Sequence, residues 1–461
     1  MRRLYEDPAY DPAWPASHWR AAHPAPFALP PLDGSATAEI AVIGAGFAGL
    51  NAALEAVRGV GADVVVLDAV QPGWGASGRN GGFCGYGGTK LSDGAIVSRT
   101  GLEGARDFRA FQRAAIAHVG ALIDDNGWNA RQGPEGEAVL AQSPKVWAGF
   151  AAEARELHEL YGEAVELVPP GALAERGLAG PGFHGALILN EGFPVDPMAY
   201  VEGLARLAID AGVRIFGQSP VTALARDGDG WRLTTPGGSL RAKKVLVATN
   251  GYSSDDLPDW IEGRALPAFS AVLVTRPLSE GERSDQGYTD PRMAFDARRL
   301  LHYFRHLPDG RFLFGMRGGV SGTIAGHRQM EAEVRRHFEA LFPAWAGAGT
   351  EHTWSGFVCL TGSLAPFVGE VPGAPGLHAA FGWHGSGVAM ASLSGREIGR
   401  LMTGQGARIP ALLSRPPRRF PLPALRRTWL RLAYAGYALK DGPLPRKPAR
   451  TPAQSPAQPR S

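Results

Sequence analysis

The chain has 461 residues, of which 44% are hydrophobic and 20% charged, and its formal net charge at pH 7 is +3. This composition is typical of a soluble globular protein, and the length allows two or three domains with large cores. A net charge this small argues against a nucleic-acid partner. Two cysteines, Cys84 and Cys359, cannot form a disulfide framework, which favours a reducing, cytoplasmic location.

Residues 1–36 combine many prolines with the aromatic side chains of Trp14, Trp19 and Phe27. This pattern predicts an extended arm that lies on a folded domain. The same segment lacks the continuous apolar core of a signal peptide, and no apolar run elsewhere reaches the length of a bilayer span. We therefore expect no transmembrane segment.

The most informative motif is a glycine-rich turn between two short apolar runs. Residues 40–43 predict a buried strand, and Gly44, Gly46 and Gly49 follow it at the start of a helix. In a dinucleotide-binding unit the first glycine makes the tight turn, the second lets a pyrophosphate approach the backbone, and the third allows helix and strand to pack closely. The helix N-terminus offers free amides and a positive dipole end to the phosphates.

The second apolar run, residues 64–67, ends at an acidic side chain, Asp68. A carboxylate at this point accepts hydrogen bonds from both ribose hydroxyls and repels a 2′-phosphate, so the motif favours FAD or NAD over NADP. It leaves open which of the two dinucleotides binds. The predicted cofactor-binding residues of this unit are Gly44, Ala45, Gly46, Phe47, Ala48, Gly49, Asp68 and Ala69.

Residues 73–82 form a second glycine-dense stretch. So many glycines in one loop indicate backbone at positive φ or backbone in contact with a ligand. Arg79 suits either a phosphate-bearing cofactor or a structural ion pair, and we favour the cofactor. The loop residues assigned to the cofactor are Gly75, Ala76, Ser77, Arg79, Asn80, Gly81 and Gly82.

The following segments separate a flavin-type domain from a simple NAD-type one. Helices are predicted at about 102–124, 148–160 and 198–211, and a short strand at 213–215. A hairpin across residues 227–230 then leads to a buried strand at 245–248 that runs into Thr249 and Gly251, which are assigned to the cofactor. Strand, hairpin and returning strand form the second half of a flavin-binding domain, whereas an NAD domain continues with alternating strands and helices.

From residue 264 to about 342 the pattern changes to strands at 271–275, 300–304 and 312–316, followed by a charged helix at 327–341. This order predicts an antiparallel sheet with helices on one side, which suits a second domain. Glycine-rich loops, strands and a helix return after residue 354. The Arg-rich segment that follows has a docked helix as its simplest interpretation, with contact to an acidic partner or membrane surface as the alternative.

Four segments together resemble the D-amino-acid-oxidase-like family of FAD-dependent oxidoreductases, and they are most similar to gamma-glutamylputrescine oxidoreductases and related amine oxidases. These segments are residues 40–49 with Asp68, called the fingerprint below, and residues 75–82, 354–369 and 381–388. The resemblance extends over residues 38–405. It implies an α/β fold, α+β overall, with a discontinuous Rossmann-like FAD-binding domain and a substrate domain that has a mainly antiparallel sheet and flanking helices.

On this basis the chain divides into segments that alternate between the two domains. The arm is residues 1–36, the C-terminal helical segment is 406–442, and a disordered tail is expected at 443–461. The FAD-binding domain is assigned residues 37–95, 180–262 and 354–405. The substrate domain is assigned residues 96–179 and 263–353.

The resemblance also assigns residues near the flavin. A helix predicted at 388–401 points its N-terminus at the flavin pyrimidine, where its amides and dipole stabilise negative charge. The family commonly has Ser-Gly-His-Gly before this helix, whereas this chain has the two side chains exchanged, so His384 is either a donor or proton carrier at the flavin edge or a histidine bonded to the backbone. The assigned residues are Gly382, His384, Gly385, Ser386, Gly387 and Val388.

Four more positions are singled out. Val221 occupies the place where relatives hold adenine with main-chain groups. Tyr303 and Arg317, on candidate strands of the second domain, are candidates for substrate contact alongside His384. Cys359 lies where distant sarcosine-oxidase-like relatives attach FAD covalently, but we expect it to be a buried core cysteine and FAD to be non-covalent. No metal-ligand spacing is present.

The resemblance implies that an amine's α-hydrogen passes as hydride to flavin N5, after which the imine hydrolyses and O2 reoxidises the flavin to give H2O2. The expected substrate is a small amine, an amino acid or a gamma-glutamylated polyamine. Three alternatives stay open: a dehydrogenase that uses another electron acceptor, an RNA-modifying flavoprotein, and a flavin-binding protein without turnover.

Overall fold

A computed structural model describes residues 2–24 and 27–445, and it places the glycine-rich fingerprint beside the central strands of a mixed sheet. The strand order is β17-β18-β11-β1-β2-β8, and the hairpin β9-β10 pairs with β11. Neighbours from β18 to β8 are parallel, and β17 is antiparallel at the edge. The strands are β1 (Gly34–Ile43), β2 (Val64–Leu67), β8 (Arg214–Phe216), β9 (Ala223–Asp227), β10 (Gly230–Thr234), β11 (Gly238–Val247), β17 (Phe367–Glu370) and β18 (Leu377–Phe381).

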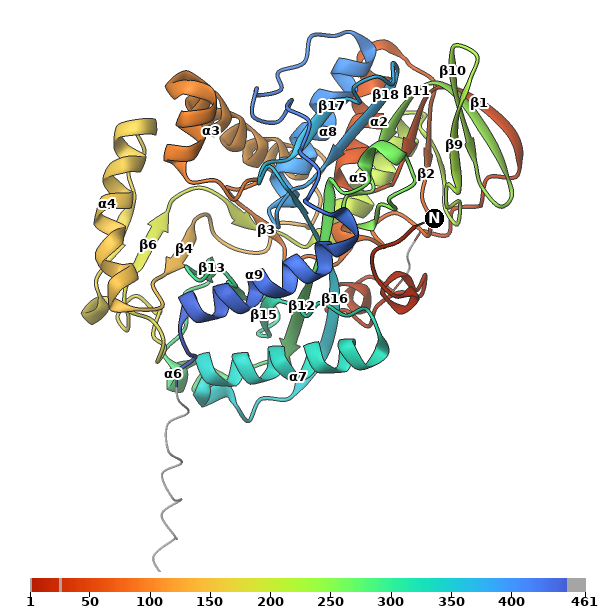
Figure 1. The fold of residues 1–461 in the computed structure, drawn as a ribbon. Coiled ribbons are helices and arrows are strands. Elements are labelled where there is room, and N and C mark those ends of the chain that lie inside the picture. Colours follow the sequence, from red (N-terminus) through yellow and green to blue (C-terminus); the bar gives the residue numbers. More distant parts are fainter. Residues whose placement is uncertain (1, 25–26, 446–461) are drawn as a thin grey trace, which may run out of the picture.

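Two long helices pack together against this sheet, α2 (Phe47–Val60) and α8 (Gly387–Thr403). Gly395 and Gly399 of α8 lie against the backbone of α2, and a Cβ added to Gly395 would stand 2.3 Å from the carbonyl oxygen of Ala48. Only glycine allows helices to approach this closely. Because of this contact, the N-termini of both helices lie at the same end of the sheet, as Figure 1 shows.

The second sheet has the strand order β16-β12-β15-β14-β13-β4-β6-β5. Its neighbours are antiparallel except for the parallel pair β13 and β4, as the mainly antiparallel prediction requires. Helix α7 (Ile324–Leu341) packs on one face of it (Figure 1). The strands are β4 (Glu137–Leu140), β5 (Glu166–Val168), β6 (Ala186–Leu189), β12 (Ala265–Thr275), β13 (Met293–Asp296), β14 (His302–His306), β15 (Phe312–Arg317) and β16 (Thr350–Thr361).

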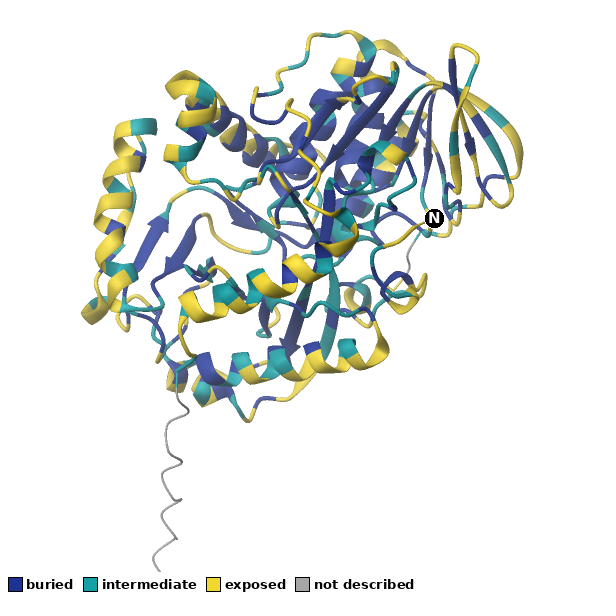
Figure 2. Ribbon diagram, in the orientation of Figure 1, coloured by how far each residue is buried: buried dark blue, intermediate teal, exposed yellow. Residues whose placement is uncertain are grey.

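Aromatic side chains fill the core between α7 and this sheet. Phe304, Phe312 and Phe314 project from β14 and β15 and are fully buried, and Phe338 of α7 meets Phe314 edge to face. Their alternation with outward residues follows the period of two that a strand imposes. Figure 2 shows both sheets as mostly buried and the outer faces of the helices as exposed. The second sheet and α7 therefore form a tightly packed layer that faces the fingerprint.

The remaining elements connect the sheets and cover their edges. The expected helices are present, most with longer limits and α5 shifted by one residue. Helix α3 is interrupted at Gly101, which has a φ of 77°. None of the helices in the described ranges has the length and hydropathy of a membrane span. The elements are α3 (Asp93–Asp125), α4 (Pro144–Tyr161), α5 (Pro197–Asp210), α6 (Glu280–Gln286), β3 (Phe83–Cys84) and β7 (Phe193–Pro194), with the 3-10 turns η2 (Ala76–Gly78), η3 (Pro170–Ala172), η4 (Asn250–Tyr252), η5 (Asp259–Ile261) and η6 (Pro343–Trp345).

The N-terminal arm is docked on both sheets and is partly helical rather than fully extended. It contains η1 (Asp7–Tyr10) and α1 (His18–Ala22), which starts where the Ser17 hydroxyl accepts a hydrogen bond from the amide of Arg20. Trp19 is fully buried and donates its indole N–H to the carbonyl of Asn80 at 2.8 Å. The arm therefore fastens the glycine-dense loop.

The C-terminal segment contains η7 (Pro423–Leu425) and α9 (Arg426–Asp441), a docked helix as its simplest interpretation predicts. Arg426 is 2% exposed, pairs with Asp255 and donates to the carbonyl of Ala265 at 2.8 Å. Its charge thus holds α9 against the protein. Most of the tail expected at 443–461 lies outside the described residues.

Strand pairing shifts two of the predicted domain limits. Strand β6 pairs with β4 of the second sheet, although residues 180–262 were assigned to the FAD-binding domain. Strand β16 pairs with β12, although residues after 354 were assigned to the same domain. A strand's sequence carries little information about its distant partner, so these limits follow only from the sheet. The discontinuous two-domain division itself remains our proposal.

Candidate functional site

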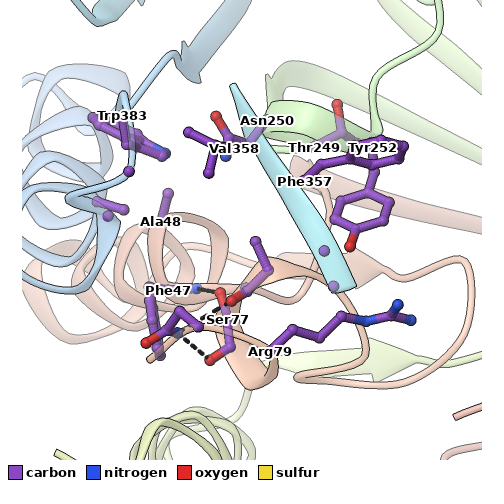
Figure 3. Close-up of a pocket in the computed structure, with 18 of the residues that line it drawn as sticks. Phe47, Ala48, Ser77, Arg79, Thr249, Asn250, Tyr252, Phe357, Val358 and Trp383 are labelled. Carbon is purple, nitrogen blue, oxygen red and sulfur yellow. Dashed lines mark hydrogen bonds between the residues drawn. The ribbon is translucent and has the colours of Figure 1, made fainter. Parts of the chain in front are cut away.

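A cavity of about 410 Å3 lies between the end of the first sheet and one face of the second sheet (Figure 3). Segments from many parts of the chain line it, and most of the predicted site residues are among them. These residues are Gly44, Ala45, Gly46, Phe47, Ala48, Asp68, Ala69, Gly75, Ala76, Ser77, Arg79, Asn80, Gly81, Val221, Thr249, Tyr303, Arg317, His384, Gly385, Ser386, Gly387 and Val388.

Four predicted glycines do not line the cavity but shape its walls. A Cβ on Gly49 would stand 2.0 Å from the carbonyl oxygen of Gly44, so Gly49 permits the close helix–strand packing expected of the third glycine. Gly82 lies against the carbonyl of Val195, and Gly251 lies against Phe357. Gly382, at a φ of 88°, donates its amide to the Asn250 side chain at 2.9 Å. Direct cofactor contact at these four positions has no support in the geometry.

The first helix terminus in the cavity is that of α2, which begins after Gly46. The Ser77 hydroxyl accepts a hydrogen bond from the amide of Phe47 at 3.0 Å, which brings the glycine-dense loop onto this terminus. Asp68 stands beside it, because its carboxylate accepts hydrogen bonds from the amides of Ala45 and Val70 at 2.8 and 2.9 Å. Burial outweighs these bonds and raises the pKa of Asp68.

Arg79 and Asn80 have different roles in their loop. The Arg79 guanidinium stacks on the Trp74 ring at 4.4 Å and donates from Nε to the carbonyl of Trp74, while its Nη2 is buried and has no partner among the described residues. Figure 3 shows this side chain extending past Ser77 toward the Tyr252 side of the cavity. The Asn80 side chain, in contrast, bonds to the loop's own backbone at residues 76, 77 and 82, so it shapes the loop.

His384 lies just before the second helix terminus, that of α8, and lines the cavity, while its role at the flavin edge stays a prediction. It is 1% exposed, it has a φ of 53°, and its amide donates to the carbonyl of Cys359 at 3.1 Å. Nε2 lies 3.2 Å from the hydroxyl of Thr361, and Nδ1 is buried without a partner in the described chain. Burial, with the nearby charges of Lys90 and Arg317, lowers the pKa of His384 to about 3, so the imidazole is neutral.

Tyr303 and Arg317 project from the second sheet into the cavity. The Tyr303 ring lies over Gly315 of the neighbouring strand, where any Cβ would collide with it, and its hydroxyl lies 2.9 Å from that of Ser270. Arg317 donates to the carbonyl of His384 at 3.4 Å and so connects the second sheet to the start of α8. Both predicted candidates therefore face the same space as His384.

Val221 lies in the cavity wall, and Cys359 is buried, as the sequence predicted for the cysteine. Val221 is 4% exposed and contributes to the cavity wall. The Cys359 side chain belongs to a core cluster with Ala265 and Phe381, while the adjacent Val358 lines the cavity. Burial raises the pKa of the Cys359 thiol to about 12, so a thiolate is not available at neutral pH.

Sequence reasoning missed several residues in the cavity wall, among them Arg3, Lys90, Glu137 and Tyr252. Lys90 is open to the cavity, and the surrounding protein, with the Arg317 charge, lowers its pKa to about 8. Glu137 is 5% exposed, and burial raises its pKa to about 8. Single charged residues in a strand or loop belong to no recognisable motif. The one available signal for Glu137 was its position as an acidic residue in the otherwise apolar strand 137–140.

The residues present fit a bound dinucleotide. Two helix termini, a carboxylate at the end of β2 and the Arg79 guanidinium, whose Nη2 has no partner in the described chain, face one cavity. Gly44 has a φ of 106°, and a Cβ there would stand 3.1 Å from the carbonyl oxygen of Ala248. Amides and dipole ends suit phosphates, and Asp68 suits ribose hydroxyls.

Comparison with known proteins agrees with this fit. The family model described as FAD dependent oxidoreductase, DAO, matches residues 39–401. The chain is 30% identical to gamma-glutamylputrescine oxidoreductase of Escherichia coli over 420 residues, covering 89% of this chain and 94% of that protein. It is 29% identical to the probable oxidoreductase OrdL of Haemophilus influenzae, covering 83% and 87%.

The fold is also found among solved structures. Glycine oxidase from Geobacillus kaustophilus superimposes with a TM-score of 0.66 and 20% identity, and the match covers 81% of this chain and 96% of that one. The cofactor is accordingly FAD, and the family model spans both the fingerprint and the start of α8. This chain belongs to the DAO family of FAD-dependent oxidoreductases.

Proposed function

We propose that the protein oxidises a C–N bond of a small amine, an amino acid or a gamma-glutamylated polyamine and transfers the electrons to O2. FAD, when bound, takes a hydride from the carbon next to the substrate nitrogen and passes both electrons to O2, which leaves as H2O2. The resulting imine is hydrolysed to a carbonyl compound and an amine or ammonia.

One observation carries the proposal: the termini of α2 and α8 open onto the same cavity that Tyr303 and Arg317 enter from the second sheet. The first terminus and Asp68 suit the phosphates and ribose of FAD, so the second terminus is left for the ring end of the cofactor. A substrate held against Tyr303 and Arg317 then lies between that ring and the sheet. No other cavity is needed for the reaction.

The chain's own side chains orient the substrate and stabilise charge. The amides at the start of α8 stabilise negative charge on the reduced cofactor. Neutral His384 has a free Nδ1, because the Thr361 hydroxyl donates to the carbonyl of Ala365 at 2.7 Å and therefore accepts from Nε2–H. We assign to His384 the role of accepting a proton or a hydrogen bond at the cofactor edge. Lys90 and Arg317 are assigned the binding of a substrate carboxylate.

An anaerobic screen tests the proposal. Purified holoenzyme is mixed with a panel of amines, amino acids and gamma-glutamylated amines, and loss of flavin absorbance identifies substrates. For each substrate, oxygen uptake with matching peroxide release is then measured. Bleaching without peroxide in air would assign the protein to the amine dehydrogenases that use another acceptor. No bleaching by any member of the panel would contradict amine oxidation.

A further inference from the structure

One carboxylate in the cavity wall has no partner. Glu137 begins strand β4, is 5% exposed, and lines the cavity next to Gly85, where an added Cβ would stand 3.1 Å from its Oε2. Within residues 2–24 and 27–445, its side chain accepts no hydrogen bond and forms no ion pair. A buried carboxylate in this state is costly, because desolvation is not repaid by any charge or donor.

The cation that acts on Glu137, Arg109, is paired with another carboxylate. Arg109 of α3 lowers the pKa of Glu137, but its guanidinium forms an ion pair with Glu163, with Nε at 2.7 Å from Oε1. Glu163 also pairs with Arg113. Burial therefore dominates at Glu137 and raises its pKa to about 8. The carboxylate is left available to a cation that enters through the cavity.

Strand register places Glu137 on the same face as the proposed substrate contacts. Met293 pairs with Glu137, Phe295 pairs with Tyr303, and Tyr303 pairs with Gly315, two residues before Arg317. Paired residues and residues two apart share a face of a sheet. Glu137, Phe295, Tyr303 and Arg317 therefore project toward the same cavity, which all four line.

The two charged ends of this face are far apart. Strands β15 and β4 are separated by three strand intervals, which is at least about 14 Å between the backbones of Arg317 and Glu137. Lys90 and Arg317 lie at one end, and the carboxyl group of Glu137, which becomes anionic when a cation binds beside it, lies at the other. Between them lie the aromatic side chains of Tyr303 on β14 and Phe295 on β13. Phe83 meets Tyr303 edge to face at 5.5 Å, and Tyr86 also lines the cavity. An aliphatic chain suits this middle section.

We propose that Glu137 binds a second, non-reacting ammonium group of the substrate, so that diamines and longer aminoalkyl compounds are preferred over simple monoamines. The inference rests on the proposed amine oxidation and narrows its substrate class. The ion pair with this ammonium offsets the free-energy cost of burying the carboxylate. The hydrocarbon between the two nitrogens lies against the aromatic side chains of Tyr303 and Phe295. A monoamine leaves Glu137 without a partner.

The test compares Glu137→Gln with wild type and with Glu159→Gln, which changes an exposed glutamate of α4. Substrates are α,ω-diaminoalkanes and n-alkylamines of matched chain length, and anaerobic flavin reduction is followed. We expect Glu137→Gln to lower kcat/KM for diamines by about 10- to 100-fold and to leave monoamines within about twofold. Glu159→Gln should change neither series.

A second measurement does not depend on turnover. Diamine binding to holoenzyme whose flavin has been reduced by dithionite is measured by calorimetry, because the reduced enzyme cannot oxidise its ligand. Glu137→Gln should weaken this binding by the same factor at unchanged FAD content. If no amine bleaches the wild type, the proposed function fails while this titration still tests Glu137.

Two results would overturn the inference. If Glu137→Gln lowers kcat/KM equally for monoamines and diamines, Glu137 contacts the reacting amine or has only a structural role. Unchanged diamine binding and turnover in Glu137→Gln would show that the carboxyl group stays protonated and does not contact the substrate.

Discussion

Nε2 of His384 lies 3.2 Å from the hydroxyl oxygen of Thr361, and this contact fixes which nitrogen of the imidazole stays free. Because the Thr361 hydroxyl donates to the carbonyl of Ala365, Nε2 carries the proton and Nδ1 keeps its lone pair. Two hydrogen bonds hold the positive φ of His384. Its amide donates to the carbonyl of Cys359, and Arg317 donates to the carbonyl oxygen of His384. The imidazole of His384 is thus held neutral and in one orientation in the cavity wall.

Substitution of this histidine should slow chemistry and spare cofactor binding. We expect His384→Ala to lower the rate of flavin reduction about 10- to 100-fold, because a hydrogen-bond partner at the cofactor edge is lost. Stopped-flow reduction with a good substrate measures the rate, and the absorbance ratio of flavin to protein measures FAD content. Since the pKa of His384 is lowered to about 3, its titration should not shape the rate between pH 5 and 8. An unchanged rate would remove His384 from the reaction.

A histidine outside the cavity should contribute to acid unfolding. Burial lowers the pKa of His118 to about 4, and its Nε2 bonds to Asn51 at 2.9 Å. Between pH 4 and 6.5 the unfolded chain binds a proton there that the folded chain does not, so stability falls as the pH decreases. His118→Gln keeps a donor for Asn51 and should reduce the drop in Tm between pH 7 and pH 5. A drop equal to that of the wild type would contradict a neutral His118.

Two glycines of the fingerprint should respond differently to alanine. At Gly49 the new Cβ would stand 2.0 Å from the backbone oxygen of Gly44, whereas at Gly46 it would meet only the Ser77 hydroxyl, at 2.8 Å. Backbone cannot move away, so Gly49→Ala should cost more than about 3 kcal/mol and yield little folded protein. Gly46→Ala should fold and bind FAD more weakly. Thermal unfolding and FAD content of the two variants check this order.

Lys90 should confer a pH dependence on carboxylate-bearing substrates. Its pKa is lowered to about 8, first by burial and then by the Arg317 charge, so its cation is lost as the pH rises above 8. We expect kcat/KM for amino acids to decline above this pH relative to amines without a carboxylate. Lys90→Met should remove the difference between the two substrate classes. Persistence of that difference in the variant would assign it to another group.

FAD should be released without a covalent bond to protein. Cys359 is buried in a core cluster, and its thiol pKa is raised to about 12. Acid precipitation of the holoenzyme should therefore leave the yellow cofactor in the supernatant, and Cys359→Ser should retain normal FAD content. Colour that stays with the precipitated polypeptide in wild type and disappears in Cys359→Ser would contradict this expectation.

The ADP half of the site could be predicted because its parts are close in sequence. Gly44, Gly46, Gly49 and Asp68 lie within one strand–helix–strand unit, whose geometry is set by local sterics and by the helix terminus. The distinction between Gly46, which lines the cavity, and Gly49, which permits packing, also followed from the motif. The roles of Gly82, Gly251 and Gly382 did not, because their contacts are with residues distant in sequence.

By itself, the sequence determined a dinucleotide-binding unit, the family and hence FAD, and the positions of most helices, because glycine geometry and hydrophobic periodicity are local properties of the chain. Only the tertiary structure decided the character of the substrate end. Glu137 and Arg317 share a cavity because strands β4, β13, β14 and β15 pair across long stretches of chain, and Lys90 lines the same cavity from the loop before α3. Desolvation by the surrounding protein raises the pKa of Glu137 and lowers that of Lys90, and this desolvation is a property of the packed molecule rather than of any segment of its sequence.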